Sequence, residues 1–190
     1  MPHADSSFVP EEIKTKQDFY EHVEMGIVAL TEGQTYWVSN LANASALLYH
    51  SYLGSPQLYG MREDGEPVVN WTGFYIHPPE LASSRESPVT APLLLGPFNG
   101  RPACQQIIPR AGKGVCADAF VNGETVLVAD VHEYPGHIAC DGMTNSEIVV
   151  PLLNKVGQVV GVLDLDSTVK GTFTEEDRIG LERIARHLAI

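Results

Sequence analysis

Two apolar segments near the C-terminus, joined by a short polar turn, constrain the possible folds most. Residues 148–153 and 159–166 are rich in β-branched and aliphatic side chains, and residues 154–158 supply the turn between them. Such segments are typical of strands. Strands joined by so short a turn pair antiparallel, because parallel strands need a crossover of a dozen residues or more. The chain is therefore predicted to contain an antiparallel sheet.

Further elements are predicted from the spacing of apolar residues. Phe19, Val23, Ile27 and Leu30 recur at helical spacing, which predicts an amphipathic helix from residue 18 to about residue 30. The same reasoning predicts a helix over 39–49, strands over 68–76, 93–95 and 125–131, a glycine-rich turn at 112–114 that enters a helix, a closing helix from Thr174, and loops over 51–67 and 77–88. This order indicates an α+β domain with a central antiparallel sheet, helices packed on one face and a ligand pocket on the other.

Size, charge and the N-terminal sequence limit the class of protein. With 190 residues and 44% hydrophobic composition, the chain is predicted to form one domain over residues 18–190, after a partly flexible segment over residues 1–17. No stretch has the ~20 apolar residues of a membrane span and no signal peptide is evident, so a cytoplasmic location is expected. A net charge of −12 without a Lys/Arg-rich run disfavours nucleic acid and membranes as partners.

Two aspartates in the second apolar strand are the first candidates for a functional site. Asp164 and Asp166 are two positions apart, so both point to one face of the sheet while Leu163 and Leu165 point to the other. Like charges side by side in an apolar strand are unfavourable unless a cation lies over them. The pair is either a solvated strand end or a site that binds an ammonium group or holds a proton. Glu147, just before the first strand, is either at the mouth of that site or a surface acid.

Three cysteines, Cys104, Cys116 and Cys140, form an odd set in a chain without an export signal. A structural disulfide framework is therefore not expected, which leaves buried thiols that pack as small hydrophobic groups, or reactive thiols. Cys140 lies in a loop-like segment close to His137. The cysteines are 12 and 24 positions apart with no Cys-x-x-Cys pair, so neither a zinc site nor a zinc deaminase is favoured.

The predicted strand over residues 68–76 carries a third group of candidates. Trp71, Gly73 and Tyr75 share one face of this strand, whereas Thr72 and Phe74 share the other. Core packing accounts for at least one of these faces. The other could be an aromatic wall that contacts the sulfur or methyl group of a small ligand.

Taken together and in order, these segments resemble the free methionine-R-sulfoxide reductase family, a class of enzymes built on a GAF domain. The resemblance covers about residues 19–188, and the matching stretches are residues 37–48, 70–75, 95–98, 102–104, 112–116, 130–132, 135–141, 146–151, 161–167 and 175–178. It implies a single GAF-like domain that reduces free L-methionine (R)-S-oxide to L-methionine. A run of motifs in the family's order is more specific than any one of them.

The resemblance also implies roles for individual residues. Cys140 matches the nucleophile that attacks the sulfoxide sulfur, and Cys104 matches the cysteine that resolves the resulting sulfenic acid into a disulfide. Cys116 matches a third cysteine, with a relay or catalytic role. Trp71 and Tyr75 match the pocket around the methyl-sulfoxide end of the substrate. The carboxylates that match those binding the ammonium and assisting protonation of the sulfoxide oxygen are Glu147, Asp164 and Asp166.

The chemistry of sulfoxide reduction is consistent with this set. A thiolate attacks a sulfoxide readily only when an acid protonates the oxygen, and clustered carboxylates raise one another's pKa so that one stays protonated near neutral pH. A second thiol then consumes the sulfenic acid. No bound cofactor or metal is expected; thioredoxin, reduced by NADPH through thioredoxin reductase, is the implied reductant, and a homodimer is the implied assembly. The competing hypothesis is a GAF sensory module that binds a small molecule without catalysis.

One segment departs from the family pattern. Family members usually separate the first two cysteines by ten positions, whereas Cys104 and Cys116 are 12 apart, and Ala117 stands where a glycine is expected. The segment between these cysteines must move during disulfide exchange. Cys104 is nevertheless expected to be the resolving cysteine, because the extra residues follow it.

Overall fold

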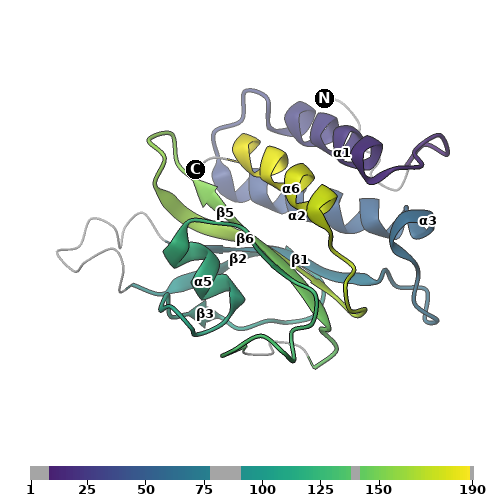
Figure 1. Ribbon diagram of the computed structural model, residues 1–190. Coiled ribbons are helices and arrows are strands. Elements are labelled where there is room, and N and C mark those ends of the chain that lie inside the picture. The colour runs from purple at the N-terminus through teal and green to yellow at the C-terminus, as the bar shows by residue number, and fades with distance from the viewer. Residues whose placement is uncertain (1–8, 78–90, 138–141, 189–190) are drawn as a thin grey trace.

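The computed structural model describes residues 9–77, 91–137 and 142–188. Its strands form one antiparallel sheet in the order β3-β2-β1-β6-β5-β4 (Figure 1). The strands are β1 (Val69–Ile76), β2 (Leu93–Asn99), β3 (Gln106–Ile107), β4 (Val126–Val128), β5 (Ser146–Leu153) and β6 (Val159–Ser167). The helices are α1 (Lys16–Thr31), α2 (Trp37–Leu53), α3 (Pro56–Tyr59), α5 (Val115–Asn122) and α6 (Glu175–His187). The hairpin predicted near the C-terminus is the β5–β6 pair.

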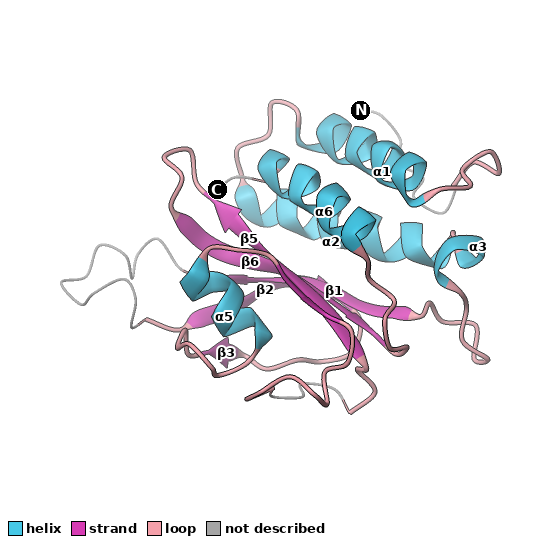
Figure 2. Cartoon of the chain, viewed as in Figure 1, coloured by secondary structure: helices cyan, strands magenta, loops and turns pink. Residues whose placement is uncertain are grey.

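Helices cover the two faces of this sheet unequally (Figure 2). α2 and α6 pack on one face, and α1 lies against both of them, whereas α5 packs on the opposite face against β4, β5 and β6. The predicted α+β fold is confirmed, and α5 adds a short helix on the face that was expected to hold the pocket. Within the described ranges, no helix has both the length and the apolar content of a membrane span.

Alternation along the central strands divides the apolar side chains between two cores. Phe74, Leu163 and Leu165 are buried beneath α2 and α6 in the larger core. Trp71 and Tyr75 belong to the second core, which lies under α5. The structure therefore confirms the predicted division of these residues between the two faces of the sheet.

Several predicted boundaries were wrong. In the predicted loop over 51–67, α2 continues to Leu53 and α3 forms, because Tyr52 and Tyr59 are buried with their rings 5.3 and 5.2 Å from that of Phe19. β2 runs past Gly96 to Asn99, and β4 is shorter than the strand predicted over 125–131. β3 was missed, since two residues are too few to show a periodic pattern. Most of the other predicted loop, residues 78–88, lies outside the described residues.

A buried carboxylate joins the helices on the face of the sheet where α2 and α6 pack. Asp177 is fully buried in the first turn of α6, where the hydroxyls of Tyr20 and Tyr59 donate to its Oδ1 at 2.9 and 2.8 Å. Its Oδ2 accepts from Lys16 Nζ at 2.5 Å and from the backbone N–H of Thr174 at 2.6 Å, the latter within the capping box that begins α6. A buried charge is tolerated only when it is paired and hydrogen-bonded. This network therefore holds α1, α3 and α6 in fixed positions.

The contact between α6 and α1 gives a test of this packing. A Cβ on Gly180 would lie 2.1 Å from the Tyr20 ring. Alanine gains about 1 kcal/mol of helix propensity, but overpacking a rigid buried ring costs about 1–3 kcal/mol, and it also disturbs the Asp177 network. We therefore expect Gly180→Ala to lower the free energy of unfolding by about 1–2 kcal/mol in urea denaturation. The control is Gly26→Ala in α1, where the new Cβ meets only the flexible end of Leu47, at 2.9 Å. That variant should be at least as stable as wild type, and equal losses in both would contradict the argument.

Candidate active site

The register of the three central strands brings the predicted acids together. On β6, Asp166 pairs with Glu147 of β5 and with Trp71 of β1, while Asp164 pairs with Gly73 of β1. Side chains directly opposite one another on neighbouring strands have Cβ atoms about 4.5–5.5 Å apart. The three carboxylates and the indole therefore share the face of the sheet that α5 covers.

An aromatic stack forms one part of this face. The Trp71 ring stacks with those of Phe98 and Tyr75, with centroids 5.5 and 6.1 Å away and interplanar angles of 15° and 21°. Gly73 permits this arrangement, because a Cβ at that position would lie 2.4 Å from the indole. The indole Nε1 donates a hydrogen bond to the backbone carbonyl of Arg101 at 3.0 Å. Trp71 thus also anchors the chain that follows β2.

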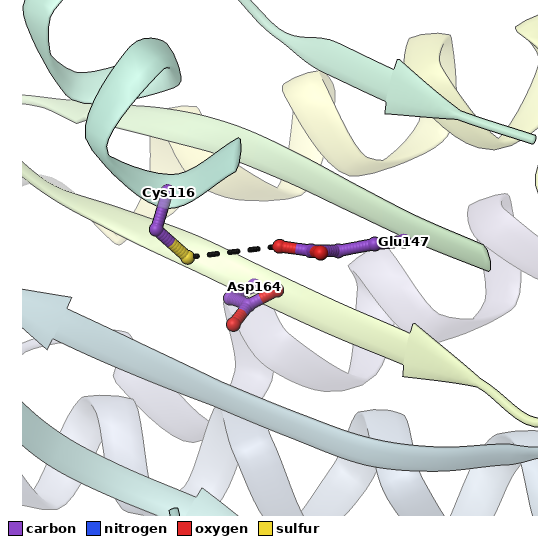
Figure 3. Close-up of side chains that lie close together, drawn as sticks. All are labelled: Cys116, Glu147 and Asp164. Carbon is purple, nitrogen blue, oxygen red and sulfur yellow. Dashed lines mark hydrogen bonds between the residues drawn. The ribbon is translucent and has the colours of Figure 1, made fainter. Parts of the chain in front are cut away.

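The glycine-rich turn before α5 places Cys116 over the acids. Gly112 and Gly114 have φ values of +75° and +109°, a region that favours glycine, and α5 begins directly after them. Cys116 lies in the first turn of α5, and its Sγ donates a weak hydrogen bond to Glu147 Oε1 at 3.9 Å (Figure 3). Asp164 points toward the same space. A thiol and two carboxyl groups thus meet between α5 and the sheet.

Burial and mutual repulsion favour the neutral forms of these groups. Burial, together with the charges of Asp164 and Glu147, raises the pKa of the Cys116 thiol well above its usual value. Burial and the Glu147 charge likewise raise the pKa of Asp164. The pKa of Glu147 is raised to about 7, first by burial and then by Asp166, while His137, with its Nε2 3.4 Å from Glu147 Oε2, opposes the increase. Glu147 therefore exchanges its proton near neutral pH, whereas Cys116 remains a thiol.

A cavity of about 400 Å³ lies beside these groups. Six of the eight residues predicted from the sequence line it: Tyr75, Cys104, Cys116, Glu147, Asp164 and Asp166. Trp71 lines a small adjoining space of about 10 Å³, which also touches Tyr75 and both aspartates. Cys140 lies outside the described residues, and the described chain on each side of that segment contributes His137 and Thr144 to the cavity.

Not all of the polar residues that line the cavity were predicted from the sequence. Arg110, Lys113 and Thr144 line it as well. Arg110 and Lys113 are isolated cations in the segment that connects two cysteines, and Thr144 is a single hydroxyl after a loop. Nothing in the sequence distinguishes any of them from an ordinary surface residue. They reach the cavity only because the chain folds back over the sheet there.

The cluster also has the spacing of a possible cation site. Cys116 Sγ and one oxygen from each of Glu147 and Asp164 lie within 4.8 Å of one another. The raised pKa values of all three groups favour bound protons at this point. The expectation that neither a metal nor a cofactor is bound stays a prediction.

The raised pKa of Glu147 predicts how stability depends on pH. A carboxyl whose pKa rises from 4.5 to about 7 on folding binds its proton more tightly in the folded protein, so stability falls as pH rises between these values. We expect Glu147→Gln to lose less stability than wild type between about pH 5 and about pH 8, measured by urea unfolding at each pH. Glu133→Gln, at an exposed position, should keep the wild-type slope. An unchanged slope in Glu147→Gln would show that this carboxyl titrates normally.

Comparisons with known proteins show a likeness over most of the chain. A profile of the GAF domain matches residues 17–190. A Saccharomyces cerevisiae protein named free methionine-R-sulfoxide reductase is 41% identical over 171 residues, which cover 90% of this chain and 84% of that protein. An Escherichia coli protein of the same name is 39% identical over 173 residues, which cover 91% and 88%.

The fold of a solved relative agrees with these sequence matches. The structure of free methionine-R-sulfoxide reductase from Neisseria meningitidis in complex with its substrate superposes with a TM-score of 0.76 at 34% identity, covering 96% of this chain and 93% of that one. Identity of this degree over nearly the full length of each protein is more than a shared GAF fold requires. The chain therefore belongs to the free methionine-R-sulfoxide reductase family of GAF-domain proteins.

Proposed function

We propose that this chain reduces free L-methionine (R)-sulfoxide to L-methionine. The observation that carries this proposal is one cavity lined by two cysteines, Cys104 and Cys116, and by three carboxyl groups. Such a cavity provides thiols for reduction and acids for protonation within the same space. Membership of the family supports the same activity, since relatives at 39–41% identity carry its name.

The cavity has the size and charge for a free amino acid. Its volume of about 400 Å³ is near the lower end of the ~300–1,000 Å³ typical of small-molecule sites. Asp164 and Asp166 would pair with the substrate ammonium, and Arg110 and Lys113 bring positive charge to the same cavity for the carboxylate. Methionine sulfoxide within a polypeptide lacks both charges. The site would therefore select the free amino acid.

The sulfoxide end of the substrate needs an acid and an apolar surface. Because the pKa of Glu147 is about 7, a substantial fraction of this residue is protonated at neutral pH and can donate to the sulfoxide oxygen. Trp71 and Tyr75 offer aromatic rings, which make favourable contacts with sulfur and methyl groups. Protonation of the oxygen makes the sulfur more electrophilic and open to attack by a thiolate.

We assign the nucleophile to Cys140 and the resolving role to Cys104, as the family resemblance implies. The nucleophile attacks the sulfoxide sulfur and takes the oxygen, so methionine leaves and a sulfenic acid remains. The Cys104 thiol then attacks that sulfenic acid, and a disulfide and water form. Cys116 is a weak nucleophile, because attack needs a thiolate and burial beside carboxylates raises the pKa of this thiol.

An external dithiol must then return the enzyme to its reduced state. We assign this role to thioredoxin, kept reduced by NADPH through thioredoxin reductase, because dithiol exchange opens a disulfide of this kind. We also assign the catalytic domain to residues 18–190, the assembly to a homodimer and the location to the cytoplasm. The family resemblance supports the homodimer, and neither a metal nor a bound cofactor is needed for the reaction.

A GAF sensory module that binds a small ligand without catalysis is the alternative. Both proposals need a ligand cavity, so the cavity alone does not separate them. The thiols separate the two proposals. A binding module has no use for two cysteines, Cys104 and Cys116, in the same cavity as an acid with a pKa of about 7. A sensor would bind methionine sulfoxide and leave its cysteines reduced.

The substrate is tested by thioredoxin-coupled oxidation of NADPH with the separate R and S epimers of free methionine sulfoxide. We expect turnover of the R epimer, and a kcat/KM lower by on the order of 100-fold for its N-acetyl derivative, which lacks the ammonium that the carboxylates would pair with. Equal kcat/KM values for the free and acetylated substrates would rule out recognition of the ammonium. Binding without NADPH oxidation and without a new disulfide would favour the sensory module.

The cysteine assignments are tested in single turnovers without thioredoxin. Cys140→Ser should form no methionine, whereas Cys104→Ser should form about one equivalent and then fail to cycle with thioredoxin. Methionine is measured by chromatography, and the disulfide in oxidised wild type is located by peptide mapping. Normal methionine formation by Cys140→Ser would transfer the nucleophile to Cys116. A dominant Cys116–Cys140 bridge with Cys104 still reduced would transfer the resolving role.

A further inference from the structure

Asp118 of α5 is a buried carboxylate that the proposed reaction does not use. Its Oδ1 accepts a hydrogen bond from the backbone N–H of Gly112 at 2.6 Å, and its Oδ2 accepts one from the hydroxyl of Tyr134 at 2.8 Å. It is not among the described residues that line the cavity. Burying a carboxylate costs free energy unless its oxygens are hydrogen-bonded, and here each oxygen has a partner. The two partners come from different segments of the chain.

Both of these segments border the cavity. Gly112 belongs to the segment between Cys104 and Cys116, in which residues 106–108, 110 and 113–115 line the cavity. Tyr134 begins a turn that ends at His137, with a hydrogen bond from the His137 N–H to the Tyr134 carbonyl at 3.2 Å. His137 also lines the cavity and lies beside Glu147. Asp118 thus connects the two segments from behind the site.

The same two segments touch directly at a pair of glycines. Gly136 has a φ of +76°, and a Cβ on it would lie 2.3 Å from the carbonyl oxygen of Gly112. Gly112 therefore contacts Gly136 through its carbonyl oxygen and Asp118 through its N–H. The Tyr134 hydroxyl donates a hydrogen bond to the same carboxylate, so Asp118 is bonded to both segments. These contacts hold the two segments together near Gly112.

We propose that Asp118 is a positioning residue for disulfide formation, acting by holding the segment between Cys104 and Cys116 against the turn that ends at His137. The proposal rests on the proposed function. In the resolving step, the Cys104 sulfur bonds to the sulfenic sulfur, the sulfenic S–O bond breaks, and water leaves with the thiol proton. A disulfide needs Cα atoms about 4.4–6.8 Å apart. Because Gly112 is anchored, movement of the segment is confined to its Cys104 end, and this keeps the effective concentration of the resolving thiol high.

The chain offers a comparable pair for control experiments. The hydroxyl of Tyr49, in α2, donates to Glu66 Oε2 at 2.9 Å, outside the cavity. Burial and the neighbouring carboxylate raise the pKa of Tyr49 to about 12, as they do for Tyr134. Removing this second hydroxyl deletes the same kind of bond without loosening either cavity segment. Tyr49→Phe and Glu66→Ala therefore control for the loss of a tyrosine–carboxylate contact.

The test separates attack from resolution in a rapid-quench single turnover with one equivalent of free methionine (R)-sulfoxide. Methionine release reports the attack, and loss of thiols with formation of the disulfide reports the resolution. In Asp118→Ala and Tyr134→Phe we expect methionine release within about threefold of wild type and disulfide formation slowed by about tenfold, so that sulfenic acid accumulates and can be trapped. Both control variants should match wild type in each step.

Asp118→Asn distinguishes positioning from loss of structure. Its amide oxygen still accepts from Gly112 and its amide nitrogen can donate to the Tyr134 hydroxyl, so we expect disulfide formation to return to within about threefold of wild type. If Asp118→Ala does not fold by circular dichroism, Tyr134→Phe, which removes one hydroxyl, carries the test. Equal slowing of both steps, or a folded Asn variant that is not rescued, would overturn the role of Asp118. Failure of wild type to release methionine would instead overturn the proposed function.

Discussion

Burial of the apolar face of β5 and β6 under the helices is the constraint on which the rest of this structure depends. Glu147, Asp164 and Asp166 face α5 because β5 and β6 alternate, and Leu163 and Leu165 on the other face are buried under the helices. A slip of one residue would exchange these two sets, placing acids in the larger core. The apolar face therefore fixes the register, and the register holds the acids together despite their repulsion.

The two faces of the sheet serve different purposes. On the face where α2 and α6 pack, buried Asp177 has hydrogen-bond donors for both oxygens, and α1, α3 and α6 are held in place around it. On the other face, the carboxyl groups of Glu147 and Asp164 lie beside a thiol, and burial raises their pKa values. A rigid, fully satisfied layer thus supports a layer whose protons are available for reaction. Sites whose polar groups are held away from their preferred charge state are typical of catalysis.

Much of the site could be predicted because it lies on strands and on a glycine-marked turn. Period-two alternation predicts that Asp164 shares a face with Asp166, and Trp71 with Tyr75, and the pairing of β1 with β6 places all four on the side of the sheet that α5 covers. Arg110, Lys113 and the partners of Asp118 could not be predicted, because their positions depend on contacts between segments distant in sequence. α3 escaped prediction for the same reason, since burial of Tyr59 rather than local propensity makes it helical.

The sequence by itself determined the fold class, the face on which each central-strand residue lies, and the family, because these follow from local periodicity and from motifs in a particular order. Only the tertiary structure decided the chemistry of the site. The pKa of Glu147 near 7 and the persistence of the Cys116 thiol result from burial, from neighbouring charges on β6 and from His137 on another segment. Desolvation and Coulomb interactions depend on distances through space, and for residues remote in sequence these distances are set only when the chain folds.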